Sequence, residues 1–124
     1  MSIPSPGESV RGSQSGVPIM ALFDLLGRSW SMGIIWQLQK GPATFRELQK
    51  RCESISPSIL NKRIKDLREA DIVERTLEGY QLTQRGEELF ELLLPFGEWS
   101  LVWAEEVFKV TEHPAFETRK NQIK

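Results

Sequence analysis

Apolar residues recur along the middle of this chain first at the spacing of helices and then, briefly, at the spacing of strands. After Pro18, apolar residues at i, i+3, i+4 and i+7 predict a first helix that ends at Gly27. The same spacing predicts a second helix that ends before Gly41 and Pro42. The apolar positions are Ile19, Leu22, Phe23 and Leu26 in the first helix, and Trp30, Ile34, Ile35 and Leu38 in the second.

The next two helices are predicted from their first residues. Thr44 and Glu47 have the spacing of a capping box, and Phe45, Leu48 and Cys52 then share one face of a short third helix. Ser56 followed by Pro57 is a favourable N-cap and first helical residue, which predicts a fourth helix over about 56–70. Its inner face is Leu60, Ile64 and Leu67, and its outer face includes Ser58, Asn61, Lys62 and Lys65.

A hairpin and a long helix complete the folded region. Residues 72–77 and 80–83 read as two short strands joined by a tight turn at Glu78 and Gly79. From Thr83 to about Val110 the pattern is helical, with a kink or break at Pro95. The expected fold is mainly α with a small β-hairpin (α+β). A folded domain over 17–111 is flanked by a flexible arm, 1–16, and a flexible tail, 112–124.

Composition narrows the function classes. A chain of 124 residues fits one domain. With Cys52 its single cysteine and His113 its single histidine, the chain has no internal disulfide, no ordinary four-ligand zinc site and no convincing catalytic pair, so we expect neither an enzyme nor a cofactor. The start lacks a signal-peptide pattern and no apolar run has membrane-spanning length, so a cytoplasmic, non-membrane protein is expected.

The charges are segregated along the chain. Residues 44–68 contain seven basic side chains and three acidic ones, whereas residues 84–112 contain two basic and seven acidic ones. A basic middle region is typical of a surface that faces a polyanion. The acidic C-terminal third therefore has a different role.

Two helices joined by a short turn and followed by a hairpin form the order of a winged helix-turn-helix. A helix fits the major groove of B-DNA and reads base edges with short polar side chains near its N-terminus. In the fourth helix these are Ser56, Ser58 and Asn61, while Lys62 and Lys65 are placed to reach phosphates of double-stranded DNA. Arg46 and Lys50 of the third helix are candidates for the flanking backbone, with plain solvent exposure as the alternative.

Several stretches, in order, resemble the HxlR-type winged-helix transcriptional regulators, relatives of the MarR group in bacteria and archaea. They read GRSW, GPATFRELQ, ISPSILNKRIKDL and YQLTQRG. The resemblance implies a cytoplasmic homodimer whose two recognition helices bind a pseudo-palindromic operator and whose terminal helices form the dimer. Many family members carry a sensing cysteine before the first folded helix, and often a longer, basic wing. Here the arm has no cysteine and Arg75 is the only base of the wing, so neither property is expected of this chain.

The long last helix carries too many apolar residues for one buried face, which predicts a dimer interface. The expected interface residues are Leu22, Phe23, Leu26, Leu93, Phe96, Trp99 and Trp103. Trp36, Trp99 and Trp103 have an alternative role in a small-molecule effector pocket, and Cys52 is expected to be a buried space-filling residue. A winged-helix module for protein–protein contact is the alternative to a DNA-binding regulator, and an enzyme is a third, weaker hypothesis.

Overall fold

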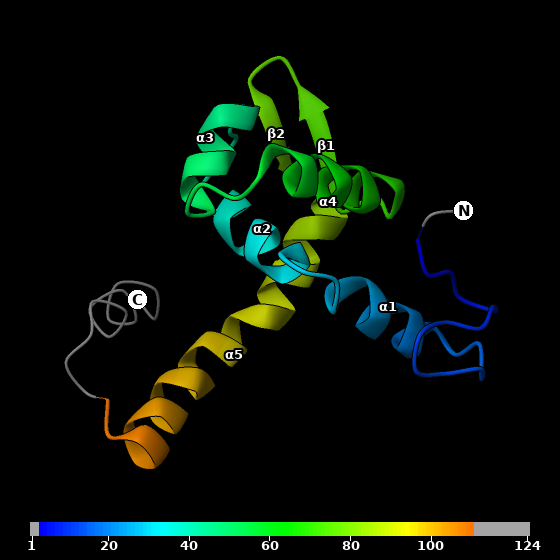
Figure 1. Ribbon diagram of the computed structural model, residues 1–124, viewed down its shortest axis with the longest axis vertical. Coiled ribbons are helices and arrows are strands. Elements are labelled where there is room, and N and C mark those ends of the chain that lie inside the picture. The colour runs from blue at the N-terminus through cyan, green and yellow to red at the C-terminus, as the bar shows by residue number, and fades with distance from the viewer. Residues whose placement is uncertain (1–2, 111–124) are drawn as a thin grey trace. The chain divides into compact units, whose positions relative to one another are not determined.

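The computed structural model describes residues 3–110. Within them, five helices and one hairpin follow in order: α1 (Pro18–Leu26), α2 (Ser31–Leu38), α3 (Phe45–Arg51), α4 (Pro57–Glu69), β1 (Val73–Thr76), β2 (Gly79–Leu82) and α5 (Gln84–Phe108) (Figure 1). The chain forms two compact units, Met1–Glu88 and Leu89–Lys124. The expected flexible tail and His113 lie outside the described residues.

Side-chain caps fix where three of the helices begin. Thr44 and Glu47 form the predicted capping box: the Thr44 hydroxyl accepts from the Glu47 amide at 3.2 Å, and the Glu47 carboxylate accepts from the Thr44 amide at 2.9 Å. The Ser56 hydroxyl accepts from the Ile59 amide at 3.2 Å at the start of α4. Thr83 caps α5 by accepting from the Gly86 amide at 2.9 Å.

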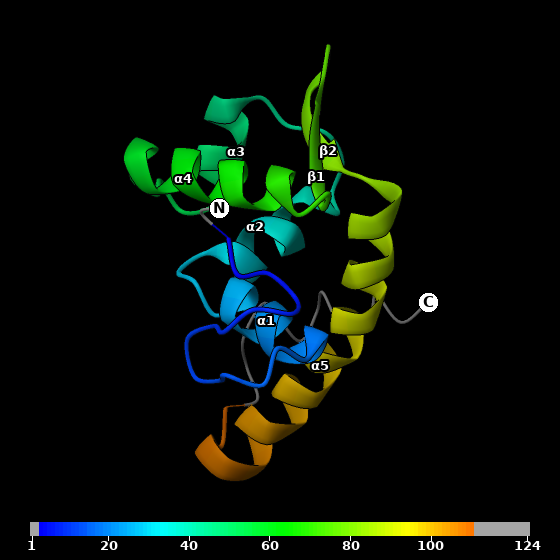
Figure 2. The same ribbon diagram turned by 90° about the vertical axis from the view of Figure 1, so that its right-hand side faces the viewer.

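The core of the first unit is built from the predicted inner faces of α2, α3 and α4. The hairpin strand β2 adds Leu82 to this core. Completely buried apolar side chains in this unit include Ile34, Ile35, Leu48, Cys52, Leu60 and Leu67. Figure 2 shows α4 lying across this unit, with the hairpin rising beside its C-terminal end.

The hairpin turns one residue earlier than predicted. Thr76 pairs with Gly79, so the two-residue turn is Leu77–Glu78, and Gly79 belongs to β2. The reason is a tertiary contact, because Ala43 and Tyr80 form a β-bridge with reciprocal hydrogen bonds of 2.9 and 2.7 Å. Gly79 has φ +121°, and a Cβ there would overlap the carbonyl oxygen of Ala43. The prediction of a turn at Glu78 and Gly79 was therefore wrong.

Helices α1 and α5 also differ from simple expectation. The predicted stripe of α1 is partly outside the core, since Ile19 is 49% exposed and Phe23 58% exposed, while Ala21 and Leu25 are buried. Trp30 does not continue the stripe of α2 but precedes that helix in a left-handed conformation, with φ 70°. Helix α5 continues through Pro95, so of the predicted kink or break, a break does not occur.

The N-terminal segment makes defined contacts within the first unit. Val10 and Ser13 form a small bridge, and the Gly7 amide donates to the Gly16 carbonyl at 2.8 Å. The Arg11 side chain lies 3.2 Å from the Asp24 carboxylate, and the Arg11 amide donates to the same carboxylate at 2.9 Å. These contacts connect the arm to α1.

Candidate nucleic-acid interface

The outward side of α4 carries the polar and basic residues expected from its sequence. Leu60, Ile64 and Leu67 are buried, which turns the opposite side of the helix to solvent. The residues predicted for that side, Ser58, Asn61, Lys62 and Lys65, are all exposed, and we call these four the α4 outer face. Ser56 is also exposed, but its hydroxyl oxygen already accepts the Ile59 amide, so its first role is to position the start of α4.

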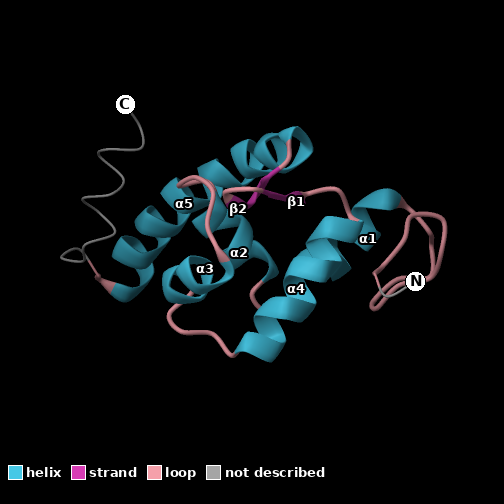
Figure 3. Cartoon of the chain, turned by 90° about the horizontal axis from the view of Figure 1, so that it is seen from above, coloured by secondary structure: helices cyan, strands magenta, loops and turns pink. Residues whose placement is uncertain are grey.

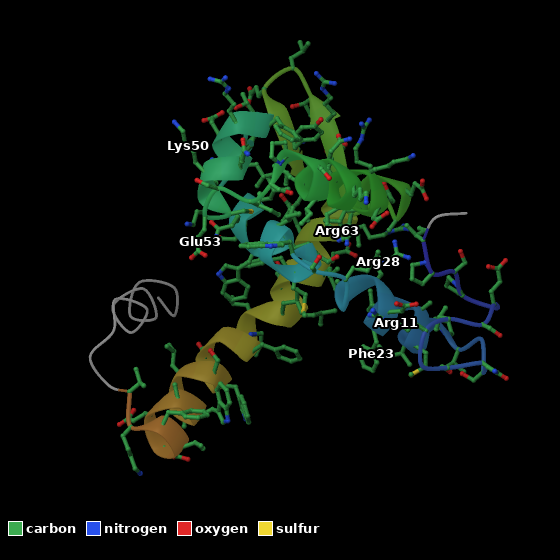
Figure 4. All side chains as sticks on the ribbon, viewed as in Figure 1. Arg11, Phe23, Arg28, Lys50, Glu53 and Arg63 are labelled. Carbon is green, nitrogen blue, oxygen red and sulfur yellow. The ribbon has the colours of Figure 1, made fainter. Side chains whose placement is uncertain are left out.

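Helix α3 contributes basic residues next to α4. Figure 3 shows the short connection that leads from α3 into α4. Arg46 and Lys50 are exposed on α3, and in Figure 4 the Lys50 side chain points away from the protein. Within residues 3–110 neither of them, nor Lys62 or Lys65, forms a salt bridge. Their charges are therefore available to an external anion.

Two other arginines of the basic region are turned inward. Arg51 donates to the carbonyls of Gly41 and Pro42 at 2.8 and 3.2 Å, which ties α3 to the connection before it. Arg63 donates from Nε to the Ser29 carbonyl at 2.8 Å, and it pairs with Asp66 at 3.2 Å. The positive charge available at the surface is thus smaller than the sequence count suggests.

A shallow groove of about 500 Å³ lies between α4 and the hairpin. It is lined by Asn61, Ile64, Lys65, Arg68, Glu69 and Tyr80. Arg68 and Tyr80 were not among the predicted site residues. The helical spacing of Asn61, Lys65 and Arg68 at i, i+4 and i+7 was the signal that could have found Arg68, whereas Tyr80 depends on the hairpin fold.

The wing has little positive charge. Its one arginine, Arg75, lies across the strand from Tyr80, with the guanidinium carbon 5.8 Å from the ring centroid. The tip is the fully exposed Leu77 beside Glu78, and Glu74 accepts a hydrogen bond from Gln81 at 2.8 Å. The hairpin thus presents an apolar and acidic tip.

Within the second unit, α5 exposes aromatic residues. Phe96 is 66% exposed, Trp99 67% and Trp103 44%. Trp99 and Trp103 stack with ring centroids 6.1 Å apart, and Phe108 meets Trp103 edge-on at 5.0 Å. Of the other predicted interface residues, Phe23 is exposed, Leu22 is half-buried, and Leu26 and Leu93 are buried at 8% exposure each. Trp36, the third tryptophan with an alternative effector role, is half-buried on α2.

Cys52 lies in the core of the first unit. It is 1% exposed and is the C-cap residue directly after α3, the helix that also buries Leu48. Burial raises the pKa of the Cys52 thiol, and the neighbouring Arg51 only partly opposes this effect. The side chain is therefore a buried thiol rather than an accessible thiolate.

Two negative findings apply to residues 3–110. No three acidic, histidine or cysteine side chains in this part of the chain gather closely enough to hold a metal ion. No helix in this range combines the length and hydropathy needed to cross a bilayer.

Comparison with known proteins defines the family. Residues 25–108 match the HxlR-like helix-turn-helix family. The regulator YodB of Bacillus subtilis is 33% identical over 85 residues, which are 63% of this chain and 76% of YodB. The quinone-bound YodB structure aligns with a TM-score of 0.62 at 34% identity, covering 66% of this chain and 93% of that one.

Two further structures support the same fold. A Thermoplasma volcanium protein described as a possible HxlR family transcriptional factor aligns with a TM-score of 0.64 at 31% identity, covering 72% of this chain and 86% of that one. A MarR-family protein of Enterococcus faecalis shares the fold at 18% identity, with a TM-score of 0.64 over 82% of this chain and 98% of that one. The chain thus belongs to the HxlR-like helix-turn-helix family, and it is a transcriptional regulator of the winged helix-turn-helix type rather than an enzyme.

Proposed function

We propose that this regulator binds DNA in a sequence-specific manner as a homodimer, with α4 in the major groove of each half of a pseudo-palindromic operator. The α4 outer face carries the proposal, because a capped helix turns Ser58 and Asn61 to solvent near its N-terminus and Lys62 and Lys65 one turn later. Short polar groups suit base edges, and lysines suit phosphates. Ser56 positions the helix and keeps a hydroxyl proton to donate, while Arg46 and Lys50 flank it on α3.

The groove beside α4 suits a DNA backbone. Lys65 and Arg68 line it from α4, and the half-buried Tyr80 lines it from the hairpin. A cation on one wall and a phenol on the other are donors for phosphate oxygens. The wing tip lacks such groups, so we assign backbone contact to the base of the wing and no minor-groove reading to its tip.

The apolar surfaces of α1 and α5 support a dimer. Each helix separately exposes large apolar side chains, with Phe23 on α1 and Phe96, Trp99 and Trp103 on α5. Soluble monomers rarely expose contiguous apolar patches beyond about a few hundred Å². A second copy of the chain would cover these side chains and place two α4 helices about 34 Å apart, the spacing of successive major grooves.

The test is selection of genomic fragments by the purified protein, followed by binding measurements on selected and shuffled sequences over a range of salt concentrations. The expected result is preference for the selected sequence, and an affinity that falls linearly with log salt because phosphate contacts release counterions. Equal and salt-insensitive binding to both sequences, or no binding at low salt, would contradict the proposal.

The wing also supports a second candidate function, a winged-helix module for protein–protein contact. Leu77 at the tip is fully exposed and is followed by the acidic Glu78, a surface that DNA does not favour. Under this hypothesis the Leu77→Ser substitution would leave DNA binding unchanged and weaken a protein contact. Because YodB has been crystallised with a quinone, a small-molecule effector is a further candidate partner.

A further inference from the structure

A buried carboxylate in α4 accepts hydrogen bonds from two arginines. The Asp66 side chain is 7% exposed, although it belongs to the helix that carries the proposed DNA-reading residues. Its Oδ2 atom lies 3.0 Å from Nη1 of Arg28 and 3.2 Å from Nη1 of Arg63. Both arginine side chains are themselves largely covered, with 24% of Arg28 and 18% of Arg63 exposed. We call Arg28, Asp66 and Arg63 the linker cluster.

The linker cluster connects α4 to the segment between α1 and α2. Arg28 and Ser29 lie in this segment, residues 27–30, which we call the α1–α2 linker. Besides the Arg28–Asp66 pair, Arg63 donates from Nε to the Ser29 carbonyl at 2.8 Å and from Nη2 to the Ser29 hydroxyl at 3.4 Å. In Figure 4 the labelled Arg28 and Arg63 lie close together, consistent with their shared contact with Asp66. Two residues of α4 therefore contact the α1–α2 linker: Asp66 binds Arg28, and Arg63 binds Ser29.

The α1–α2 linker is itself conformationally defined. Its backbone is closed by hydrogen bonds from the Gly27 amide to the Phe23 carbonyl at 2.8 Å and from the Ser31 amide to the Arg28 carbonyl at 3.1 Å. Trp30 follows with φ 70°, a conformation that a bulky residue adopts only when its surroundings hold it there. Because the linker backbone is fixed, the positions of Arg28 and Ser29 depend on the direction of α1.

The chemistry of the linker cluster favours a role in orientation. A buried ion pair contributes little net stability compared with well-packed apolar residues, but it requires specific distances and directions. An arginine fork adds planar, directional hydrogen bonds that a leucine would not provide. In addition, the cluster withdraws Arg63 from the α4 outer face, where neighbouring Lys62 and Lys65 remain exposed.

We propose that Arg28, Asp66 and Arg63 are positioning residues that set the orientation of α4 relative to α1, and thereby the half-site spacing that a dimer accepts. The spacing part of this proposal rests on the proposed function, because α1 exposes Phe23 for dimer contact and α4 carries the reading residues. The orientation part rests on the first unit alone. A small rotation of α4 would displace its outer face in both halves of the dimer in opposite directions.

The orientation is tested without DNA. Spin labels are attached to Val17→Cys, at the start of α1, and Lys62→Cys, on α4, in a Cys52→Ser background. Dilution with unlabelled protein isolates distances within one chain. Asp66→Asn keeps the size of the side chain and removes its charge. The expected result is a broadened and shifted distance distribution in Asp66→Asn and an unchanged one in the control Asp71→Asn.

Asp71 is a suitable control because it undergoes the same chemical change at an exposed pair. Its carboxylate is 65% exposed and lies 3.7 Å from Arg85. If Asp66→Asn does not fold, Arg28→Lys replaces it, since lysine keeps the charge but loses the fork. An unchanged distribution in a folded variant would overturn the proposal and leave the cluster a purely stabilising contact.

The spacing is tested with unlabelled variants on the selected operator and on versions with one base pair added or removed between half-sites. The expected result for Asp66→Asn is a roughly tenfold loss of affinity for the operator, unchanged affinity for random DNA and a weaker penalty for altered spacing. An unaltered spacing preference would overturn the spacing part of the proposal. If the unmodified protein bound no DNA, the proposed function would fail, while the label distances would still decide the orientation.

Discussion

Lys65 is the residue of the α4 outer face for which the proposed function makes the simplest prediction. It is exposed, lines the groove beside Arg68 and has no ion pair within residues 3–110. Lys65→Ala is expected to weaken binding to all DNA sequences alike. The slope of log affinity against log salt should fall by roughly 0.9 for each lost phosphate contact, and so by about twice that in a dimer. Lys109→Ala, outside the first unit, is the matched control, and an equal effect of both substitutions would contradict the assignment.

Asn61 lies one turn before Lys65 and has a different expected role. Its amide can donate and accept together, which matches the adenine edge in the major groove. Asn61→Ala is therefore expected to narrow the difference between operator and random DNA by about 1–3 kcal/mol per half-site, with the salt slope unchanged. Binding competitions at constant salt measure this difference. A uniform loss on every sequence would instead assign Asn61 to the DNA backbone.

Cys52 provides a prediction about reactivity. Because burial raises its pKa, the thiol is expected to react slowly with alkylating reagents in the folded protein and quickly after unfolding. Cys52→Ser should bind DNA normally, with and without mild peroxide, apart from a small loss of stability. Gel-shift assays of both proteins provide the comparison. An oxidant response in the parent that is lost in Cys52→Ser would show that the thiol is a sensor.

At the residue scale, sequence reasoning located the outer face of α4 but not the linker cluster. Leu60, Ile64 and Leu67 repeat at helical spacing, so the opposite side of the helix follows from local geometry. Asp66 was only one acid among basic neighbours. Its burial depends on Arg28, 38 residues earlier, and no local pattern carries information about a contact of that range.

At the element scale, the capping box of α3 has a pH-dependent consequence. Hydrogen bonds from the amide and hydroxyl of Thr44 hold the pKa of Glu47 below its ordinary value in the folded protein. Since the folded pKa is lowered, this contribution to stability is present above the unfolded pKa and is lost as pH falls through the folded pKa. Glu47→Ala should destabilise the protein at neutral pH, and the difference should shrink in acid.

Thermal or urea unfolding at several pH values measures this difference. Glu78→Ala is the control, because Glu78 is an exposed acid in the hairpin turn and not at a helix start. A difference between parent and Glu47→Ala that persists unchanged at low pH would assign the effect to helix propensity rather than to the carboxylate.

The elements themselves show which parts of the fold are locally encoded. The capping residues of α3 and α4 were found from sequence because each cap lies within three residues of its partner. The hairpin turn was misplaced by one residue, because the position of Gly79 is determined by the Ala43 carbonyl, more than thirty residues earlier. Local turn preferences could not include that contact.

At the scale of the whole molecule, the apolar face of α5 predicts an obligate dimer. Light scattering at low micromolar concentration should report twice 14.2 kDa. Trp103 stacks on Trp99 and meets Phe108, so it belongs to the aromatic group expected at the interface. The substitution Trp103→Glu should therefore place a charge in that interface. The expected products are monomers or aggregates with lost operator affinity. A soluble, folded monomer of the unmodified chain would refute both the interface and the palindromic operator.

The apolar residues of α1 show why the sequence predicts the dimer interface only in part. Ile19 and Phe23 have the helical spacing of buried residues, yet they are 49% and 58% exposed in the single chain. Hydrophobic periodicity reports that a face avoids water, not which chain covers it. Leu26 and Leu93, also expected at the interface, are buried already in one chain, so they offer a partner less surface.

The bridge between Ala43 and Tyr80 divides the hairpin into an anchored base and a free end. The base is fixed by reciprocal backbone hydrogen bonds and by a glycine that accepts no larger residue, whereas Leu77 and Glu78 contact little else. Extra residues inserted at the tip would extend into solvent without disturbing the core. The hairpin is therefore a natural grafting point, where a longer, arginine-bearing loop could add a minor-groove contact that the proposed function does not assign to the present wing.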